Sequence, residues 1–234
     1  TFSGEGTNNL VNNIAQFHVE ENAQCEINLL QNFSESTSAI STTEVYQEQN
    51  STFRINTATV SGLLIRNNIN ISVAGQNCET YMNGAVVSKG KMHVDNHTFV
   101  DHKVSNCQSN ENYKYVLNDD STGVFNGKVI VRPDAQIINA YQNNGNIILS
   151  DKANINSKPE LEIYADDVKC SHGSTTGQLD EDALFYLQSR GISKKASKQM
   201  LVAAFISEVI EEVKDEKMVE LIEAAIQKEH GWSF

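Results

Sequence analysis

The feature that most restricts the fold of this chain is a long succession of short apolar or Thr-rich runs, separated by Asn, Gly, Asp and Ser, between about residue 9 and residue 171. In the segments 53–59 and 69–73, every second residue is apolar or Thr, which is the period of a strand with one buried face. Turn residues recur too often for helices to fit between the runs. We therefore expect an all-β region.

A loose repeat near the end of this region indicates how its strands are arranged. The segments 134–137, 152–155 and 167–170 are similar and follow one another at spacings of 18 and 15 residues, which we interpret as about one rung of a parallel β-solenoid. Such rungs cannot bury their own apolar faces, so they stack and share a core. A β-sandwich is the alternative, because turn residues such as those at 126–127 could close hairpins.

The last part of the chain changes to helical periodicity. Asp180 is expected to cap a first helix that ends at Gly191, and Ser193 to cap a second. The second and third helices each carry an apolar stripe, formed by Val202, Phe205, Ile206, Val209, Ile210 and Val213 and by Met218, Leu221, Ile222, Ala225 and Ile226. We predict a β-domain over residues 1–179 and a helical domain over residues 180–234, with some apolar surface left for another protein.

Composition restricts the partners and the compartment. The net charge of −12 repels nucleic acid and anionic membrane surfaces, and no apolar run is long enough to span a bilayer. The four cysteines have no zinc-site spacing, which favours a reduced, cytoplasmic setting; they are Cys25, Cys78, Cys107 and Cys170. The chain begins at Thr1 in what resembles a repetitive strand region, so we expect a fragment without its N-terminal portion.

Four sequons of the N-x-S/T type begin at Asn32, Asn50, Asn70 and Asn96. In a chain so rich in Asn, Ser and Thr, such sequons arise by chance. Together with the Asn-rich and Thr-rich rungs they nevertheless define an alternative function, a β-solenoid adhesion or carbohydrate-binding module.

Two motifs suggest chemistry that their details do not support. The segment 84–92 resembles a phosphate-binding loop, but five residues separate its glycines where four are needed, and a methionine replaces the residue that holds magnesium. The His and Asp residues of 93–102 suggest a divalent-metal site, and a metal-dependent enzyme using Asp95 and His97 is a further alternative, although strand parity separates His102 from them. No Ser/His/Asp arrangement indicates an enzyme, so we expect none.

Cys170 and His172 are separated by one residue at the boundary between the β-region and the helices. On a strand they point to the same side, with Cα atoms about 6.5 Å apart. Thiolates and imidazoles both bind iron, but one of each is at most half a site, so further ligands would come from another subunit or from sulfide. An ordinary core Cys and a hydrogen-bonded His are the alternative.

The segment around this pair, residues 161–192, reads LEIYADDVKCSHGSTTGQLDEDALFYLQSRGI. It resembles very closely the C-terminal signature of the SufB/SufD family of iron-sulfur cluster assembly proteins, and of its SufD members in particular. The similarity continues forward through the helical tail and backward through residues 94–102, 113–117, 124–127 and 134–136. It therefore covers most of the chain and weakens toward the N-terminus.

The resemblance implies a right-handed parallel β-helix with a C-terminal helical domain, and an N-terminal helical region that this chain lacks. It implies a non-enzymatic scaffold that pairs through its β-helix with the paralogue SufB, or with itself as a homodimer. Residues 180–234 would dock the ABC-type ATPase SufC. The iron-sulfur cluster would be held transiently at the subunit interface, and the participation of a flavin is left open.

Carried onto this sequence, His172 is the histidine of the family's K-C-S-H-G motif. The resemblance implies that it binds iron of the cluster at the seam between subunits. Cys170 is its neighbour there, as a further ligand or as a structural thiol. Ser174 departs from the family pattern, which usually has Ala after H-G, and leaves the local packing open.

Overall fold

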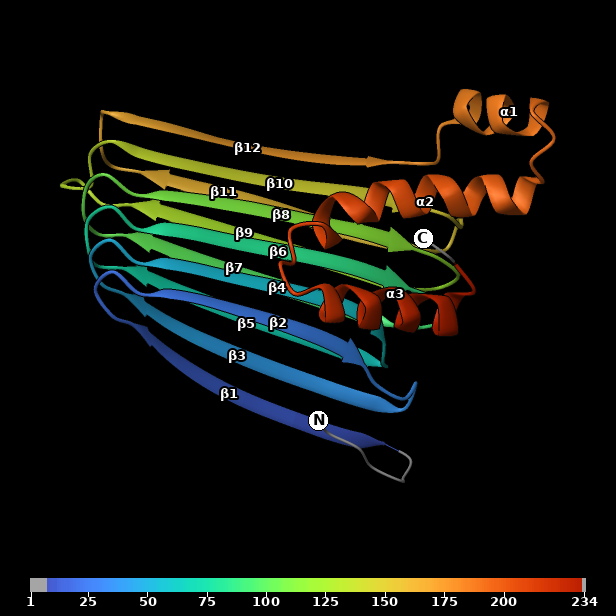
Figure 1. Ribbon diagram of the computed structural model, residues 1–234, viewed down its shortest axis with the longest axis horizontal. Helices are drawn as coiled ribbons and strands as arrows, with labels where there is room; N and C mark the ends of the chain where they lie inside the picture. The colour runs from blue at the N-terminus through green and yellow to red at the C-terminus, as the bar shows by residue number, and fades with distance from the viewer. Residues whose placement is uncertain (1–7, 233–234) are drawn as a thin grey trace.

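The computed structural model describes residues 8–232, so the outermost residues of the two predicted domains lie outside the described part. Within that part the chain forms a parallel β-helix followed by three helices (Figure 1). The strands are β1 (Asn9–Val19), β2 (Gln24–Asn32), β3 (Thr37–Gln47), β4 (Thr52–Ser61), β5 (Leu64–Val73), β6 (Glu79–Ser88), β7 (His93–His102), β8 (Gln108–Leu117), β9 (Thr122–Val131), β10 (Ile138–Ile148), β11 (Asn154–Ile163) and β12 (Val168–Gly177). The helices are α1 (Glu181–Ser189), α2 (Lys194–Ile210) and α3 (Glu216–His230).

The strands alternate between two parallel sheets. One sheet has the order β1-β3-β5-β7-β9-β11, and the other has the order β12-β10-β8-β6-β4-β2. The solenoid prediction is therefore confirmed, and the β-sandwich alternative is wrong. The interpretation of the 15- and 18-residue spacing is also wrong, because it covers only one strand and one corner. Leu64 pairs with His93 and His93 with Thr122, so a full turn there takes 93 − 64 = 29 residues.

The core lies between the two sheets, where every second side chain points inward. In β7 the residues of one parity are buried and those of the other are half-buried up to the end of the strand. Phe53, Met82, Tyr115 and Phe125 are among the large side chains that are almost completely buried. The apolar alternation of the sequence therefore marks the wall of a stacked core, in which each turn is covered by the next.

Asparagine shapes one set of corners. Asn22, Asn50, Asn77 and Asn106 each precede a strand of the β12-to-β2 sheet and have φ between 57° and 63°, a left-handed conformation that Asn tolerates better than most residues. The Asn50 amide donates to the Asn22 side chain and the Asn77 amide to that of Asn50, both at 3.0 Å. The stacked turns thus share a ladder of side-chain amides along this corner.

The three helices form as the sequence predicts. The Asp180 carboxylate accepts hydrogen bonds from the backbone N–H groups of Asp182 and Ala183, and the Ser193 hydroxyl caps α2 in the same way. Both caps satisfy backbone donors that the first helical turn leaves unpaired. No helix in residues 8–232 is long and apolar enough to cross a membrane.

Helices α2 and α3 cover the outward face of the β12-to-β2 sheet (Figure 1). Val60, Val87 and Val116 point outward from this sheet and are buried in one apolar cluster with Ile206 and Ile226. The stripe predicted for the second helix is confirmed as its buried face, with Phe205 partly exposed. In the third helix, the stripe prediction is wrong for Leu221, whose side chain is 57% exposed.

Candidate functional site

The two sheets end side by side at the C-terminal end of the β-helix. Strands β11 and β12 are the last strands of their sheets, so each is paired on only one side within the described residues. Strands β9 and β10, by contrast, have neighbours on both sides. The last turn is therefore an open end, where inward-pointing side chains lose the cover that a following turn would provide.

Both predicted site residues lie on β12 in this open end. Cys170 is in register with Ala140 of β10, and His172 is in register with Gln142. Ala140 and Gln142 are buried inward residues, and side chains in register share a face of the sheet. Cys170 and His172 therefore point toward the lumen, as the one-residue spacing predicts. Residues 164–167 form the corner that separates β11 from β12.

The two side chains differ in exposure. Cys170 is half-buried and packs against the main core, and this burial raises the pKa of its thiol above the ordinary value. His172 is exposed, and its imidazole has no hydrogen bond or ion pair with any described residue. The two side chains thus differ in environment: burial favours the protonated thiol of Cys170, whereas the imidazole of His172 is accessible to a partner.

The register places His172 at the end of one inward column. The column runs through Ile27, Ile55, Met82, Glu111, Gln142 and His172, one residue from each strand of the sheet. Its first half is apolar and its second half is polar. The change occurs between Met82 and Glu111, well before the open end.

Polar contacts continue along the lumen beside this column. The Ser174 hydroxyl lies 2.8 Å from the Ser157 hydroxyl of β11 and donates to the Asn144 side chain at 3.2 Å. Ser174 thus links the last strands of the two sheets. This contact is a local role for the residue at which the sequence departs from the family pattern.

A buried carboxyl group lies two strands below His172. Glu111 is 3% exposed, and burial raises its pKa to about 7. The Gln142 amide donates to its Oε2 atom at 2.9 Å. Gly127 of β9 makes room for this pair, because a Cβ atom there would lie 2.9 Å from both Gln142 Nε2 and Glu111 Oε2. Sequence reasoning missed Glu111 and Gln142, since nothing in their spacing distinguishes them from solvated positions.

The donor set at the open end suits iron only in part. A thiol and an imidazole are ligand types of iron and of iron-sulfur clusters. The described residues contain no group of three or more His, Cys, Asp or Glu side chains that could hold a metal ion together. Cys170 and His172 are two such donors, and the supply of further ligands by another subunit or by sulfide stays a prediction from the sequence.

The histidine-rich strand β7 does not assemble a metal site. His93, Asp95 and His97 share its outward face, and Asp95 is engaged by Arg66 at 2.5 Å and by His97 at 2.9 Å. His102 points inward, as strand parity predicts, and its Nε2 atom lies 2.9 Å from the Ser109 hydroxyl. The metal-dependent enzyme alternative is therefore not supported.

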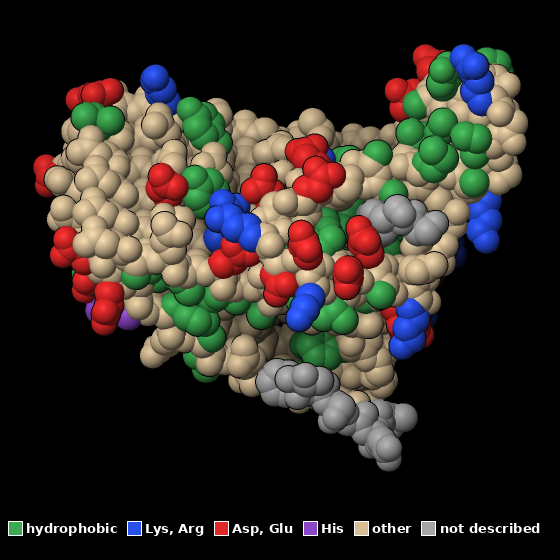
Figure 2. All heavy atoms as spheres, viewed as in Figure 1, with side chains coloured by type: hydrophobic (Ala, Val, Ile, Leu, Met, Phe, Trp, Pro, Cys, Tyr) green, Lys and Arg blue, Asp and Glu red, His purple; other side chains and the backbone are tan. Residues whose placement is uncertain are grey.

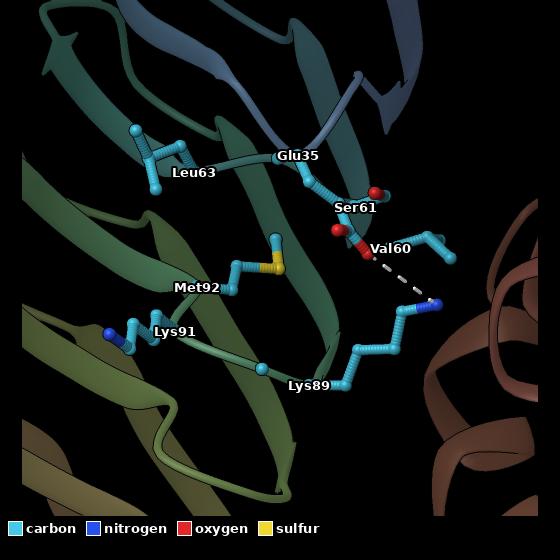
Figure 3. Close-up of a pocket in the computed structure, with 9 residues that line it drawn as sticks. Glu35, Val60, Ser61, Leu63, Lys89, Lys91 and Met92 are labelled. Atoms are coloured by element: carbon cyan, nitrogen blue, oxygen red, sulfur yellow. Dashed lines mark ion pairs between the residues drawn. The ribbon is translucent and has the colours of Figure 1, made fainter.

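The segment that resembles a phosphate-binding loop lines a cavity of about 280 Å³ (Figure 3). Lys89 points toward Glu35 across this cavity, whereas Lys91 points away (Figure 3). Lys89 also lies 3.6 Å from the Glu229 carboxylate, and the backbone N–H of Gly90 donates to Asp119. Acidic groups thus occupy the donors that a phosphate would need.

One of the four sequons lies inside the solenoid, at Asn96. Asn96 is 2% exposed, and its amide donates at 2.7 Å to the Tyr115 hydroxyl inside the lumen. A glycan cannot be attached there in the folded chain. The sequon therefore arises from the polar lining of the solenoid.

The fold and the open end define a class: a parallel β-solenoid with a packed helical tail, whose last turn carries a cysteine and a histidine on its inward face. Comparison with known proteins gives the family. The model of the SUF-system iron-sulfur cluster assembly SufBD core domain matches residues 1–205. The chain belongs to this family.

Two curated relatives show how much of a protein this chain represents. An iron-sulfur cluster assembly SufBD family protein of Synechocystis is 34% identical over 202 residues, which are 86% of this chain and 45% of that protein. The iron-sulfur cluster assembly protein SufD of Escherichia coli is 34% identical over 167 residues, which are 71% of this chain and 40% of that protein. The chain thus spans less than half the length of these relatives.

Proposed function

We propose that this chain is the β-helix and helical tail of a non-enzymatic scaffold for iron-sulfur cluster assembly, in which His172 binds iron of a nascent cluster at a subunit seam. The cluster is cargo that the scaffold builds and passes on. The paralogue SufB, or a second copy of the chain, covers the open end, and residues 180–234 dock the ABC-type ATPase SufC.

The observation that carries this proposal is the position of His172 in its column. The preceding members Ile55, Met82, Glu111 and Gln142 are each at most 3% exposed, whereas His172 is exposed at the end of the lumen. An imidazole can bind iron through a ring nitrogen that is unprotonated and accessible. His172 is accessible in this chain and would become enclosed when a partner covers the open end.

The same end of the β-helix is suited to a protein partner. Among residues 8–232, strands β11 and β12 each have a neighbour on one side only, and such free edges can add strands from a second chain. Exposed apolar side chains lie on and beside the last turn; they are Ile137, Tyr141, Ile163 and Tyr164. A partner on these edges would bring its own ligands next to Cys170 and His172 and complete the set of donors.

The helical tail offers a separate apolar surface. Phe185 and Tyr186 of α1 are 74% and 58% exposed, and Figure 2 shows apolar side chains gathered over this helix at the upper right of the molecule. Met200 and Leu221 are also exposed. Large exposed apolar side chains on a helix commonly mark a protein contact, which supports the proposed docking of the ATPase. The boundary between the β-domain and the helical domain at residue 180 is likewise proposed.

The role of His172 is tested by His172→Ala in the reconstituted complex. We expect cluster yield to fall at least about tenfold, the range for loss of a metal-site interaction, while assembly of the complex is unchanged. Ser171→Ala, which alters the outward face of the same strand, is the control and should keep the wild-type yield. An unchanged yield in His172→Ala, with intact assembly, would refute the role. Cys170→Ala in the same assay separates a ligand, with lost yield, from a structural thiol.

The docking surface is tested by point variants, because α2 and α3 cover apolar residues of the sheet and their removal would expose them. Phe185→Asp combined with Tyr186→Asp should abolish co-purification of the ATPase while the melting temperature changes little. Gln188→Ala on the same helix is the control. Retained ATPase binding in the double variant would contradict this docking surface.

A further inference from the structure

Gln142 lies between a buried carboxyl group and the proposed cluster ligand. It lies on β10, in register with Glu111 of β8 on one side and with His172 of β12 on the other. Neighbouring strands are about 4.8 Å apart. The Gln142 side chain is therefore within reach of both neighbours in the column.

One end of the Gln142 amide is anchored. Its Nε2 atom donates to Glu111 Oε2 at 2.9 Å, and both side chains are 3% exposed. Gly127 keeps the opposite wall clear, since a side chain there would collide with both groups. A hydrogen bond to a buried acidic group in a packed lumen fixes the orientation of the amide.

The other end of the amide is unused. Gln142 Oε1 is buried and has no hydrogen-bond partner among the described residues. Buried carbonyl oxygens without a partner are uncommon and costly. The two polar atoms of an amide diverge, so an Nε2 atom directed at β8 turns Oε1 away from β8. The strand on the far side of Gln142 is β12, which carries His172.

His172 carries an imidazole N–H that can serve as the donor this oxygen lacks. Its exposed imidazole has no hydrogen-bond partner among the described residues, so its side chain can turn toward the amide without breaking a contact. A neutral imidazole carries one N–H, and accepting that proton in a hydrogen bond fixes which ring nitrogen remains free. Histidine ligands of metals are commonly oriented in this way by a carbonyl or a carboxylate.

We propose that Gln142 is a positioning residue, whose Oε1 atom accepts a hydrogen bond from the His172 imidazole and so selects the ring nitrogen that is offered to iron. This proposal rests on the proposed function for its biological meaning. The hydrogen bond itself is a property of the chain alone. Glu111 acts one step further away, by holding the amide in the orientation that presents Oε1.

The first test measures the tautomer of His172 without a cluster or a partner. Nitrogen-15 NMR of the 234-residue chain, at a pH where the imidazole is neutral, should show one predominant His172 tautomer in the wild type. Gln142→Met, which keeps the length of the side chain and removes the amide, should shift the ring-nitrogen signals toward a mixture of the two tautomers. Asn143→Met, on the outward face of the same strand, should leave the signals unchanged. Equal tautomer ratios in wild type and Gln142→Met would overturn the proposal.

The second test separates anchoring from packing. Glu111→Gln keeps an oxygen that accepts from Gln142 Nε2, so it should retain the predominant tautomer. Glu111→Leu removes that acceptor and should give the mixture. If both Glu111 variants behave alike while folded, as judged by their melting transitions, the anchoring step is wrong.

Cluster yield then connects the hydrogen bond to the proposed function. Gln142→Met should lower the yield of the reconstituted complex about tenfold, and Asn143→Met should not. If His172→Ala leaves the yield unchanged, the proposed function fails, yet the tautomer test still decides the role of Gln142. If the tautomer changes in Gln142→Met and the yield does not, the hydrogen bond exists without serving cluster assembly, and the proposal is refuted as a positioning role.

Discussion

The two halves of the column that ends at His172 differ in chemistry although their backbone is the same. Ile27, Ile55 and Met82 occupy three successive turns and contribute to the apolar core. Glu111, Gln142 and His172 occupy the next three and carry a carboxyl group, an amide and an imidazole.

The difference shows which side chains an inward position of the solenoid can hold. A polar group in the lumen is tolerated if a neighbouring turn supplies a hydrogen-bond partner, as Gln142 does for Glu111, or if no further turn covers it, as at His172. The polar side chains of the second half are therefore explained by these two conditions, and not by burial alone. The predictions below start from this contrast and extend it to the corners, from the largest expected effect to the smallest.

The apolar half should carry more of the stability. Met82 is completely buried, so Met82→Ala leaves a cavity and should lower the free energy of unfolding by about 3 kcal/mol. His172→Ala at the exposed end of the same column should change it by less than about 0.5 kcal/mol. Urea denaturation of both variants measures the contrast. Similar losses at the two positions would mean that the open end is covered in the chain alone.

The buried carboxyl group should make stability depend on pH. Burial raises the pKa of Glu111 to about 7 from an ordinary value of 4.5, so the folded chain favours the protonated form. Its contribution is complete below about pH 4.5 and is lost as the pH rises through 7, a difference of about 3 kcal/mol. Relative to Glu111→Gln, which does not titrate, the wild type should therefore lose stability between pH 5 and pH 8.

The comparison with Glu111→Gln at each pH removes the effect of other groups. Burial lowers the pKa of His102 to about 4, so its contribution is lost as the pH falls from about 6.5 toward 4, with the opposite sign. Both chains contain His102, and its effect cancels in their difference. A difference that is constant from pH 5 to pH 8 would show that Glu111 does not titrate in this range.

The corners also differ between the regular turns and the last ones. Ile137 occupies the corner position that Asn106 occupies one turn earlier, and both have left-handed backbones, with φ of 59° and 63°. This conformation is strained for a β-branched residue. Ile137→Asn should raise the free energy of unfolding by about 1 kcal/mol, and Asn106→Ile should lower it by a similar amount. If the denaturation midpoints of both variants moved in the same direction, backbone strain would not explain the changes in stability.

The strained corner lies near the proposed partner surface. Ile137 is 54% exposed, so it contributes little to the core of the chain alone. An apolar side chain at a strained, exposed position is consistent with a contact made outside the chain. If this contact exists, Ile137→Asn will stabilise the isolated chain and weaken assembly of the complex.

The sequence predicted the strand-rich region and the helices because their signals are local. Alternating residues in 53–59 mark one strand wall, and Asp180 and Ser193 mark helix starts by the hydrogen bonds of their own side chains. The predicted length of one solenoid turn was wrong. A repeat of 15 or 18 residues looks the same in the sequence whether it spans a whole turn or half of one. The side chain of Leu221 fits the helical period, yet the position of α3 on the sheet leaves it exposed.

What the periods and spacings of the sequence determined by themselves is the all-β region, the helical tail, and the shared direction of Cys170 and His172, since each depends on a few neighbouring residues. The choice of a parallel solenoid over a β-sandwich came from the family resemblance. The tertiary structure decided which end of the solenoid stays open and which inward residues meet across turns. Glu111, Gln142 and His172 are about 30 residues apart in the chain, and they form one column only because each strand pairs with the strand one full turn away. That register follows from the sum of many side-chain contacts along the whole lumen, which no single motif records.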